Sequence, residues 1–283
     1  MNSVDTPGSL LITVAGVLPV RADASHRAEM ISQTLCGEIV HILAEHGDWY
    51  QIKMPDGIQG WLAAGGTRAA SPQEADEWRR SASSVSLGMT VTDLSGRQAS
   101  TPVVVPWGAR LKPAARGRVE FPDGASGLPC DSELVVSSDS LSERFPAHGA
   151  DIAKTALRWL GTPYLWGGRT EAGADCSGFV QSVFRVHGIE LPRDSEPQAE
   201  TGSDVLVRPN EEPNLMAGDL LFFGSSECPE KIEHVGISLG GSLMVHCAAG
   251  NGGTAIDDLG GDGEYERCLG WLLASARRPG ELG

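Results

Sequence analysis

The first part of the chain alternates hydrophobic and polar residues in the manner of short β-strands. The stretch LCGEIVHILAEHGDWYQIKM at residues 35–54 alternates on both sides of a turn, EHGDW, and the dipeptide Asp56–Gly57 marks a further turn. No helical spacing of apolar residues competes with this pattern. We therefore predict a small β-barrel over residues 8–68.

Strand patterns return over residues 86–140, after a small, polar and charged stretch at residues 69–85 that predicts a linker or one short helix. The hexapeptide PDGIQG at residues 55–60 recurs as PDGASG at residues 122–127. PDG is a common turn sequence and can recur by chance, but the strand-rich flanks of the two copies also match. The echo favours a second, divergent barrel of the same design.

The pattern changes to helical spacing after the proline-containing segment SERFPAHGAD. Asp151 is expected to cap a helix over residues 152–160, and a second helix is expected over residues 176–187. Two strand patterns follow, GDLLFFG and HVGISLGGSLMVHCA, and the Gly240–Gly241 pair divides the second into a hairpin. Helices followed by an antiparallel sheet predict an α+β domain, which we place at residues 145–283.

Composition and charge narrow the classes of partner. The net charge is −15 and the isoelectric point is about 4.8, which argues against binding to nucleic acid or to an anionic membrane surface. No segment has the roughly 18 apolar residues that span a bilayer, and the N-terminal apolar run lacks the basic flank of a signal peptide. None of the six cysteines forms a CxxC pair. We expect a reduced, cytoplasmic protein without a disulfide framework.

Cys176 is the first candidate for chemistry. It begins the predicted second helix within GADCSGFV, where small residues flank it. Free backbone N–H groups and the positive end of the helix dipole are expected to lower the pKa of a thiol at this place. A structural cysteine at a helix start is the alternative, and the position alone does not decide between them.

His234 and His246 are the second and third candidates. They are twelve residues apart on the two strands of the predicted hairpin, so both are expected near the same end of it. Cysteine catalysis needs a base beside the thiol and a third group that orients the base. His234 is predicted to be the base and His246 its orienting partner. Backbone N–H groups at the helix start, including that of Cys176, are expected to form part of an oxyanion hole.

Zinc binding is an alternative for these residues, with Cys247 or Cys228 as a further ligand. No pair of them has the two-to-four-residue spacing usual in structural zinc sites. The remaining histidines and cysteines are predicted to be non-catalytic: His26, His41, His46, His148, His187, Cys36, Cys130 and Cys268.

Five motifs occur in a fixed order in the C-terminal half: YLWGG, DCSG, LPRDSEPQ, GDLLFF and HVGI. In this order they resemble the NlpC/p60 cysteine peptidases. The resemblance implies a papain-like α+β domain in which Cys176 is the nucleophile, His234 the base and His246 the orienting residue, with no metal or organic cofactor. It also implies hydrolysis of peptidoglycan stem peptides at the bond from γ-D-glutamate to diaminopimelate or lysine.

The N-terminal half resembles bacterial SH3 domains. Two such domains before an NlpC/p60 domain resemble the YkfC-type γ-D-glutamyl-L-diamino acid endopeptidases, in which the first SH3-like domain closes one end of the groove and only peptides with a free N-terminal L-alanine enter. The residues that this resemblance assigns to substrate binding are Asp175, Ser177, Tyr164, Trp166, Asp194 and Ser195. The sequence departs from this group at Ile58, where a tyrosine is usual, and at Ile31, where a glutamate is usual.

The predicted protein is therefore a cysteine endopeptidase acting on free peptides in murein recycling, with a peptidoglycan stem peptide as its partner. One alternative is a protein that binds the cell wall through its SH3-like domains. Another is a wall-remodelling amidase or acyltransferase on the same papain-like scaffold. The sequence leaves the oligomeric state open.

Overall fold

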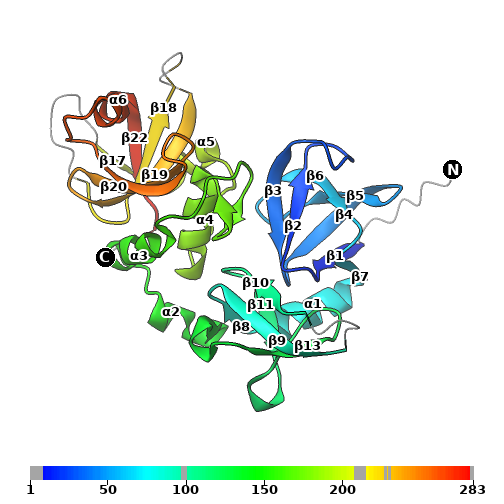
Figure 1. Ribbon diagram of the computed structural model, residues 1–283. Helices are drawn as coiled ribbons and strands as arrows, with labels where there is room; N and C mark the ends of the chain where they lie inside the picture. The colour runs from blue at the N-terminus through cyan, green and yellow to red at the C-terminus, as the bar shows by residue number, and fades with distance from the viewer. Residues whose placement is uncertain (1–8, 97–100, 207–214, 226–227, 229–230, 281–283) are drawn as a thin grey trace. The chain divides into compact units, whose positions relative to one another are not determined.

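The computed structural model describes residues 9–96, 101–206, 215–225, 228 and 231–280. The chain divides into two compact units, Met1–Ser140 and Leu141–Gly283 (Figure 1). The N-terminal unit contains two seven-stranded sheets, and the C-terminal unit contains a six-stranded sheet with helices. This confirms the predicted α+β domain preceded by two small β-domains.

The first sheet is antiparallel throughout, and its strands have the order β3-β2-β6-β5-β4-β1-β7. The strands are β1 (Leu10–Thr13), β2 (Val17–Arg21), β3 (Met30–Leu35), β4 (Ile39–His46), β5 (Trp49–Lys53), β6 (Gln59–Ala63) and β7 (Thr67–Ala70). Its core is a cluster of Leu11, Val20, Val40, Ile52, Met54 and Leu62. Ile58 packs against this cluster as a partly buried residue, so the side chain that replaces the usual tyrosine contacts the core of its own sheet.

The second sheet repeats the topology of the first. Its order is β10-β9-β13-β12-β11-β8-β14, so every strand corresponds to the strand seven places earlier in the chain. The strands are β8 (Ser84–Ser86), β9 (Met89–Ser95), β10 (Val103–Val105), β11 (Arg110–Pro113), β12 (Val119–Glu120), β13 (Ser126–Pro129) and β14 (Val135–Ser137). Short 3-10 segments lie at Ala115–Gly117, Ser132–Leu134 and Ser138–Ser140.

The two PDG turns have the same geometry. In the first, Ile58 donates its N–H to Asp56 Oδ1 at 3.2 Å, and Gly57 has a φ of +92°. In the second, Ala125 donates to Asp123 Oδ1 at 3.1 Å, and Gly124 has a φ of +82°. Glycine adopts this left-handed conformation without a steric penalty. The sequence echo therefore reflects two equivalent hairpins, each placed before the same strand of its sheet.

Helix α1 (Pro72–Ser81) occupies most of the stretch for which the sequence predicted a linker or a short helix. Ser71 and Glu74 form a capping box at its start, which satisfies free N–H groups of the first turn. The buried Trp78 donates its indole N–H to the Gly37 carbonyl at 3.0 Å. The helix contacts β1 and β7 of the first sheet and β11 of the second, so it joins the two sheets into one unit.

The sheet of the C-terminal unit has the order β17-β22-β18-β19-β20-β21, and its described pairs are antiparallel. Its strands are β17 (Ser203–Val205), β18 (Leu220–Gly224), β19 (Ile232–Gly240), β20 (Leu243–Ala248), β21 (Gly253–Asp258) and β22 (Leu273–Arg278). A separate two-stranded ribbon is formed by β15 (Arg169–Thr170) and β16 (Gly173–Ala174). The helices are α2 (Leu141–Arg144), α3 (Gly149–Ala156) with a 3-10 extension over Leu157–Trp159, α4 (Cys176–Val186), α5 (Ser195–Gln198) and α6 (Glu264–Leu272).

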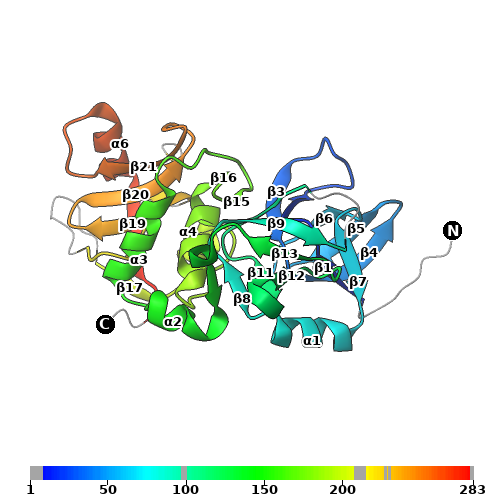
Figure 2. The ribbon, with the colours of Figure 1, turned by 60° about the horizontal axis from the view of Figure 1, so that its bottom comes forward.

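Helices α3 and α4 lie side by side against the sheet of this unit (Figures 1 and 2). Phe179 and Val183, which are four residues apart on α4 and so share one face of it, are fully buried. The predicted second helix is confirmed, whereas the predicted cap of the first is wrong. Helix α3 begins at Gly149 with His148 at the N-cap position, and Asp151 lies in its first turn. Only glycine fits at the first position, because a Cβ on Gly149 would lie 1.9 Å from the Ala217 carbonyl oxygen.

His187 at the end of α4 is a structural residue with two partners. Its Nδ1 lies 2.7 Å from the Pro146 carbonyl oxygen and its Nε2 lies 2.9 Å from the Thr155 hydroxyl. The sequence predicted a non-catalytic histidine, and these two contacts give its ring a structural role. The ring joins the end of α4 to α3 and to the segment before it.

Candidate active site

The start of α4 is built by close contacts between glycines of the YLWGG and DCSG motifs. A Cβ on Gly178 would lie 2.1 Å from the Gly168 carbonyl oxygen, and one on Gly168 would lie 2.4 Å from the Gly173 carbonyl oxygen. These backbone contacts leave no space for any larger residue. They explain why both motifs end in glycine, and they fix the loop before α4 against its first turn, where Cys176 is the first residue.

Asp175 caps this helix and carries a buried ion pair. Its carboxylate accepts N–H bonds from Gly178 at 2.7 Å and from Gly167 at 2.8 Å. Arg193 donates to both carboxylate oxygens, at 3.0 and 2.6 Å, and to the Ser177 hydroxyl at 2.9 Å. The Arg193 side chain is 1 % exposed and that of Asp175 10 %. Asp175 and Ser177, both predicted to bind substrate, are thus held together by an arginine that the sequence analysis did not single out.

The two candidate histidines meet across the β19–β20 hairpin. The turn residues Gly240 and Gly241 have φ values of +97° and +63°, as the predicted tight turn requires. Nε2 of His234 lies 2.6 Å from Nδ1 of His246. A Cβ on Gly236 would lie 3.1 Å from Cβ of His246, which is closer than ordinary van der Waals contact. The missing side chain leaves the His246 ring space beside His234.

A carboxylate continues this chain of side chains. Nε2 of His246 lies 2.6 Å from Oδ2 of Asp257, and the Asn251 side-chain amide donates to the same oxygen at 2.7 Å. Neither Asp257 nor Asn251 was predicted from the sequence. The glycine-rich turn at residues 249–253 after His246 was the available signal, because it predicts a third strand that returns beside the histidine.

Cys176 lies against β19 beside His234. The backbone of Val235, the residue after His234, hydrogen-bonds the Cys176 sulfur, as does the backbone of Ser177. Helix α4 packs on β19 along this contact. The structure therefore brings the three predicted catalytic residues to one place at the start of α4. Their roles stay predictions.

Burial determines the charge states of Cys176 and His234. Burial is the largest effect that raises the pKa of Cys176 to about 12, and the charge of the Asp175 carboxylate is the second. Burial is likewise the largest effect that lowers the pKa of His234 to about 3, and the charge of His246 is the second. The expectation of a lowered thiol pKa is therefore wrong, because desolvation of the thiolate outweighs its backbone hydrogen bonds. At pH 7 the thiol and the imidazole are therefore both neutral before substrate binds, so a reaction that uses the thiol as nucleophile must include transfer of its proton to a base.

The other predicted substrate residues differ in their exposure. Tyr164 is half-buried, and burial, followed by the Cys176 charge, raises its pKa to about 12. Trp166 is 60 % exposed. Asp194 is exposed at the N-cap position of α5, and Ser195 is the half-buried first residue of that helix. None of these positions tests a contact with substrate, so the assignments stay predictions.

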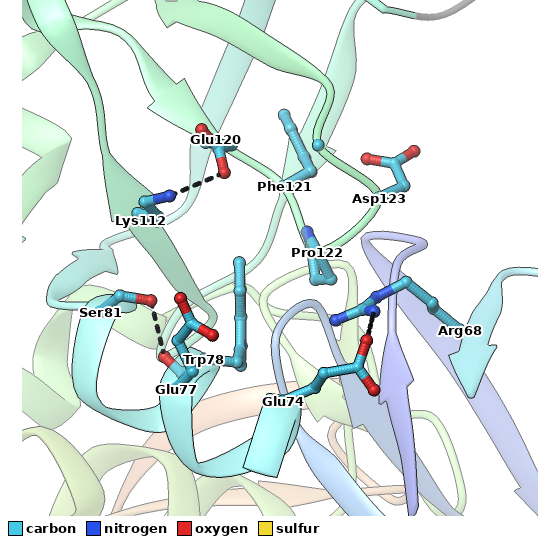
Figure 3. Close-up of a pocket in the computed structure, with 11 residues that line it drawn as sticks. Arg68, Glu74, Glu77, Trp78, Ser81, Lys112, Glu120, Phe121, Pro122 and Asp123 are labelled. Carbon is cyan, nitrogen blue, oxygen red and sulfur yellow. Dashed lines mark hydrogen bonds and ion pairs between the residues drawn. The ribbon is translucent and has the colours of Figure 1, made fainter. Parts of the chain in front are cut away.

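A cavity of about 340 Å³ lies elsewhere, between α1 and the second sheet of the N-terminal unit (Figure 3). Its lining includes ion pairs of Arg68 with Glu74 at 3.4 Å and of Lys112 with Glu120 at 3.1 Å. It contains none of the candidate catalytic residues. Across the part of the chain that the structure describes, no three or more His, Cys, Asp or Glu side chains are arranged to hold a metal ion, and no helix there is long and apolar enough to cross a membrane.

Two buried histidines, His187 and His246, and the half-buried His234 predict that acid destabilises the C-terminal unit. Burial lowers the pKa of His187, His234 and His246, that of His234 to about 3, from an unfolded value near 6.5. As the pH falls below about 6.5, the unfolded chain takes up protons that the folded unit does not bind, so the free energy of unfolding falls. Each neutral histidine contributes up to about 1.4 kcal/mol per pH unit.

Urea unfolding at pH 7, 6 and 5 measures this effect, because most carboxylates stay ionised over that range. We expect the free energy of unfolding to decrease at each step, and to decrease less steeply in a His187→Gln variant. A free energy that is constant from pH 7 to pH 5 would contradict the prediction.

Comparison with known proteins gives the family. A model of the NlpC/P60 family matches residues 161–271, and a model of the bacterial SH3 domain matches residues 16–67. The chain is 30% identical over 224 residues to the gamma-D-glutamyl-L-lysine dipeptidyl-peptidase of Bacillus subtilis (strain 168), across 76% of this chain and 71% of that protein. It is 26% identical over 252 residues to the enzyme of the same name from Bacillus cereus, across 84% and 73% of the two chains.

Solved structures show the same fold. An NlpC/P60 family protein from Bacillus cereus superposes with a TM-score of 0.77 at 21% identity, covering 95% of this chain and 99% of that one. An NlpC/P60 endopeptidase from Photobacterium damselae gives a TM-score of 0.69 at 15% identity, covering 99% and 76%. The chain therefore belongs to the NlpC/P60 family, and it is a cysteine peptidase related to the endopeptidases of peptidoglycan.

Proposed function

We propose that the protein hydrolyses the bond between γ-D-glutamate and the diamino acid of peptidoglycan stem peptides. The substrates in this proposal are free peptides with an N-terminal L-alanine, released from the glycan and recycled in the cytoplasm. The observation that carries the proposal is the cysteine at the start of α4 beside a histidine pair joined by a 2.6 Å contact. The names of the Bacillus relatives, which specify the γ-D-glutamyl-L-lysine bond, support the choice of substrate.

The chemistry follows from the neutral thiol and imidazole. As Cys176 Sγ attacks the γ-carbonyl carbon, the thiol proton passes to His234. The oxygen becomes an oxyanion, which in this proposal accepts hydrogen bonds from backbone N–H groups at the start of α4. When the C–N bond breaks, His234 gives the proton to the leaving amine of the diamino acid. Water, activated by the same imidazole, then hydrolyses the thioester and regenerates the thiol.

The proposed contact of Asp175 with the alanine ammonium is limited by what its carboxylate already binds. Arg193 and two backbone N–H groups occupy both oxygens. An ammonium group at this place shares a carboxylate whose charge is already balanced. We therefore propose a preference for a free amine that is moderate in size, with Ser177, Tyr164, Trp166, Asp194 and Ser195 completing the substrate site.

Hydrolysis of four synthetic tripeptides tests the proposal. They are L-Ala-γ-D-Glu-L-Lys, its meso-diaminopimelate counterpart, the N-acetylated lysine peptide and the isomer in which glutamate is linked through its α-carboxyl group. We expect cleavage of the first two after glutamate, kcat/KM about tenfold lower for the acetylated peptide, and no cleavage of the α-linked isomer. Mass spectrometry of the products distinguishes hydrolysis from acyl transfer.

Each part of the proposal has its own contrary outcome. Equal rates for the free and acetylated peptides would remove the free-amine preference but leave the bond assignment intact. Cleavage of the α-linked isomer at the rate of the γ-linked peptide would overturn the bond assignment. A transfer product in place of free dipeptide would favour the acyltransferase alternative.

A further inference from the structure

Asp257 lies where it can determine which nitrogen of each catalytic histidine carries a proton. In the β20–β21 pairing, His246 is opposite Ala255 and Asp257 is opposite Met244. His246 and Asp257 are therefore diagonal neighbours on one face of the sheet. The contact of 2.6 Å joins a His246 side chain that is fully buried to a carboxylate whose side chain is 16 % exposed.

The direction of each hydrogen bond follows from what the atoms can donate. An ionised carboxylate only accepts, and Oδ2 of Asp257 also accepts from the Asn251 amide at 2.7 Å. The facing Nε2 of His246 must therefore carry the N–H. Burial lowers the pKa of His246, so at pH 7 the ring is neutral and has only this one N–H. Its Nδ1 is then a lone pair.

The same reasoning applies to the His234 ring. Because Nδ1 of His246 accepts, Nε2 of His234 at 2.6 Å must donate. A neutral His234 with its proton on Nε2 has its lone pair on Nδ1, the other nitrogen of the ring, which is the one left for Cys176. If Asp257 were replaced by a group that does not accept a hydrogen bond, neither ring would have a fixed tautomer. In the tautomer with a proton on Nδ1, His234 has no lone pair at that nitrogen with which to take the thiol proton.

We propose that Asp257 is a positioning residue that sets the tautomers of both histidines through His246 and so keeps Nδ1 of His234 free as the base for Cys176. The proposal rests on the proposed roles of these three residues. Asp257 also stabilises the imidazolium that forms when His234 takes the thiol proton, because its charge is connected to that ring by two short hydrogen bonds. Asn251 holds the carboxylate in place, and the Tyr265 ring stacks beside His246 with centroids 6.5 Å apart.

Substitutions at Asp257 distinguish the effect of its negative charge from the effect of its hydrogen-bond acceptor. Asp257→Ala removes both, whereas Asp257→Asn keeps an oxygen that can accept from His246 and Asn251. We expect kcat on L-Ala-γ-D-Glu-L-Lys to fall about 100-fold in the alanine variant and about tenfold in the asparagine variant, with KM within about threefold of the wild-type value. Loss of structure alone would not lower kcat by these two different factors while KM stays nearly unchanged.

Asp258 provides a matched control on the same strand. It is the next residue, so its side chain points to the opposite face of the sheet, where it accepts from the Gly260 N–H at 2.9 Å. Asp258→Ala and Asp258→Asn should keep kcat within about twofold of wild type. A similar fall in kcat at both positions would show a general effect of disturbing β21 and would overturn the proposal.

Nitrogen-15 spectra of the histidine side chains test the tautomers without substrate. In the wild-type protein at pH 7 we expect His234 and His246 each to be protonated on Nε2 and unprotonated on Nδ1. In Asp257→Ala we expect mixed tautomers at both rings. A wild-type His234 protonated on Nδ1, or an Asp257→Ala variant with wild-type kcat, would overturn the inference. Because the spectra need no peptidase activity, a wrong substrate assignment leaves this test intact.

Discussion

Replacing Cys176 with alanine should lower kcat on L-Ala-γ-D-Glu-L-Lys by about 10⁵-fold or more. Removal of the nucleophile from a catalytic group that acts as a unit costs this much in other hydrolases, because the remaining residues retain only binding and oxyanion stabilisation. Here the loss should be close to complete. With the thiol absent, no thioester can form, so the two-step route through His234 is closed.

Cys176→Ser should also be severely impaired. The Cys176 side chain is half-buried, and desolvation raises the pKa of its thiol to about 12, so the neutral form predominates at pH 7. Even so, sulfur passes its proton to a base far more readily than a hydroxyl does. The serine variant should therefore bind the peptide with a KM near that of the wild type and turn it over very slowly.

A second cysteine of the same unit controls for effects unrelated to the nucleophile. Cys268 is exposed on α6, and Cys268→Ser should keep kcat and KM within about twofold of wild type. Activity is measured by mass spectrometry of the released dipeptide, and folding is compared by circular dichroism. Turnover by the purified Cys176→Ala variant at more than a trace level would exclude Cys176 as the nucleophile.

Local sequence patterns predicted the elements that present the catalytic side chains. The helical spacing after Cys176 and the Gly240–Gly241 turn correctly indicated α4 and the β19–β20 hairpin, because both depend on short-range geometry. The repeated PDG turn likewise indicated two sheets of one topology. The helix and the hairpin are each encoded within about fifteen residues of chain, a range over which spacing and turn chemistry determine structure.

Features that depend on contacts between distant segments were missed. Arg193 reaches Asp175 across 18 residues of sequence, and nothing in the local pattern of LPRDS shows where its guanidinium points. Asp257 depends on the register between β20 and β21, which a single sequence does not fix. The error in the thiol pKa has the same origin, since the helix start is visible in the sequence but the burial that opposes it is not.

The largest effect on stability is expected at the Asp175–Arg193 ion pair. Arg193→Met leaves a buried carboxylate whose charge is no longer balanced, and Asp175→Asn leaves a buried guanidinium facing a neutral amide. Each single substitution should lower the free energy of unfolding of the C-terminal unit by about 3–5 kcal/mol, since an unpaired buried charge cannot recover its lost hydration. Asparagine keeps an N-cap oxygen for Gly178, so the effect at Asp175 comes from the charge.

The double variant, Asp175→Asn with Arg193→Met, distinguishes charge pairing from packing. It buries no charge at this place, and a buried ion pair is often replaceable by neutral groups at little net cost. We expect the double variant to be more stable than either single variant, and within about 2 kcal/mol of the wild type. The coupling energy from the four proteins, measured by urea unfolding followed by circular dichroism, should then be several kcal/mol.

An exposed ion pair of the same unit sets the scale for this comparison. Asp204 pairs with Arg277 at 2.6 Å, but its side chain is 85 % exposed, and Asp204→Asn should cost less than about 1 kcal/mol. If the two single variants at the buried pair cost no more than this control, the pair would not stabilise the unit. If instead the double variant were as unstable as the sum of the singles, packing around Arg193 and not its charge would hold the start of α4, and with it Cys176, in place.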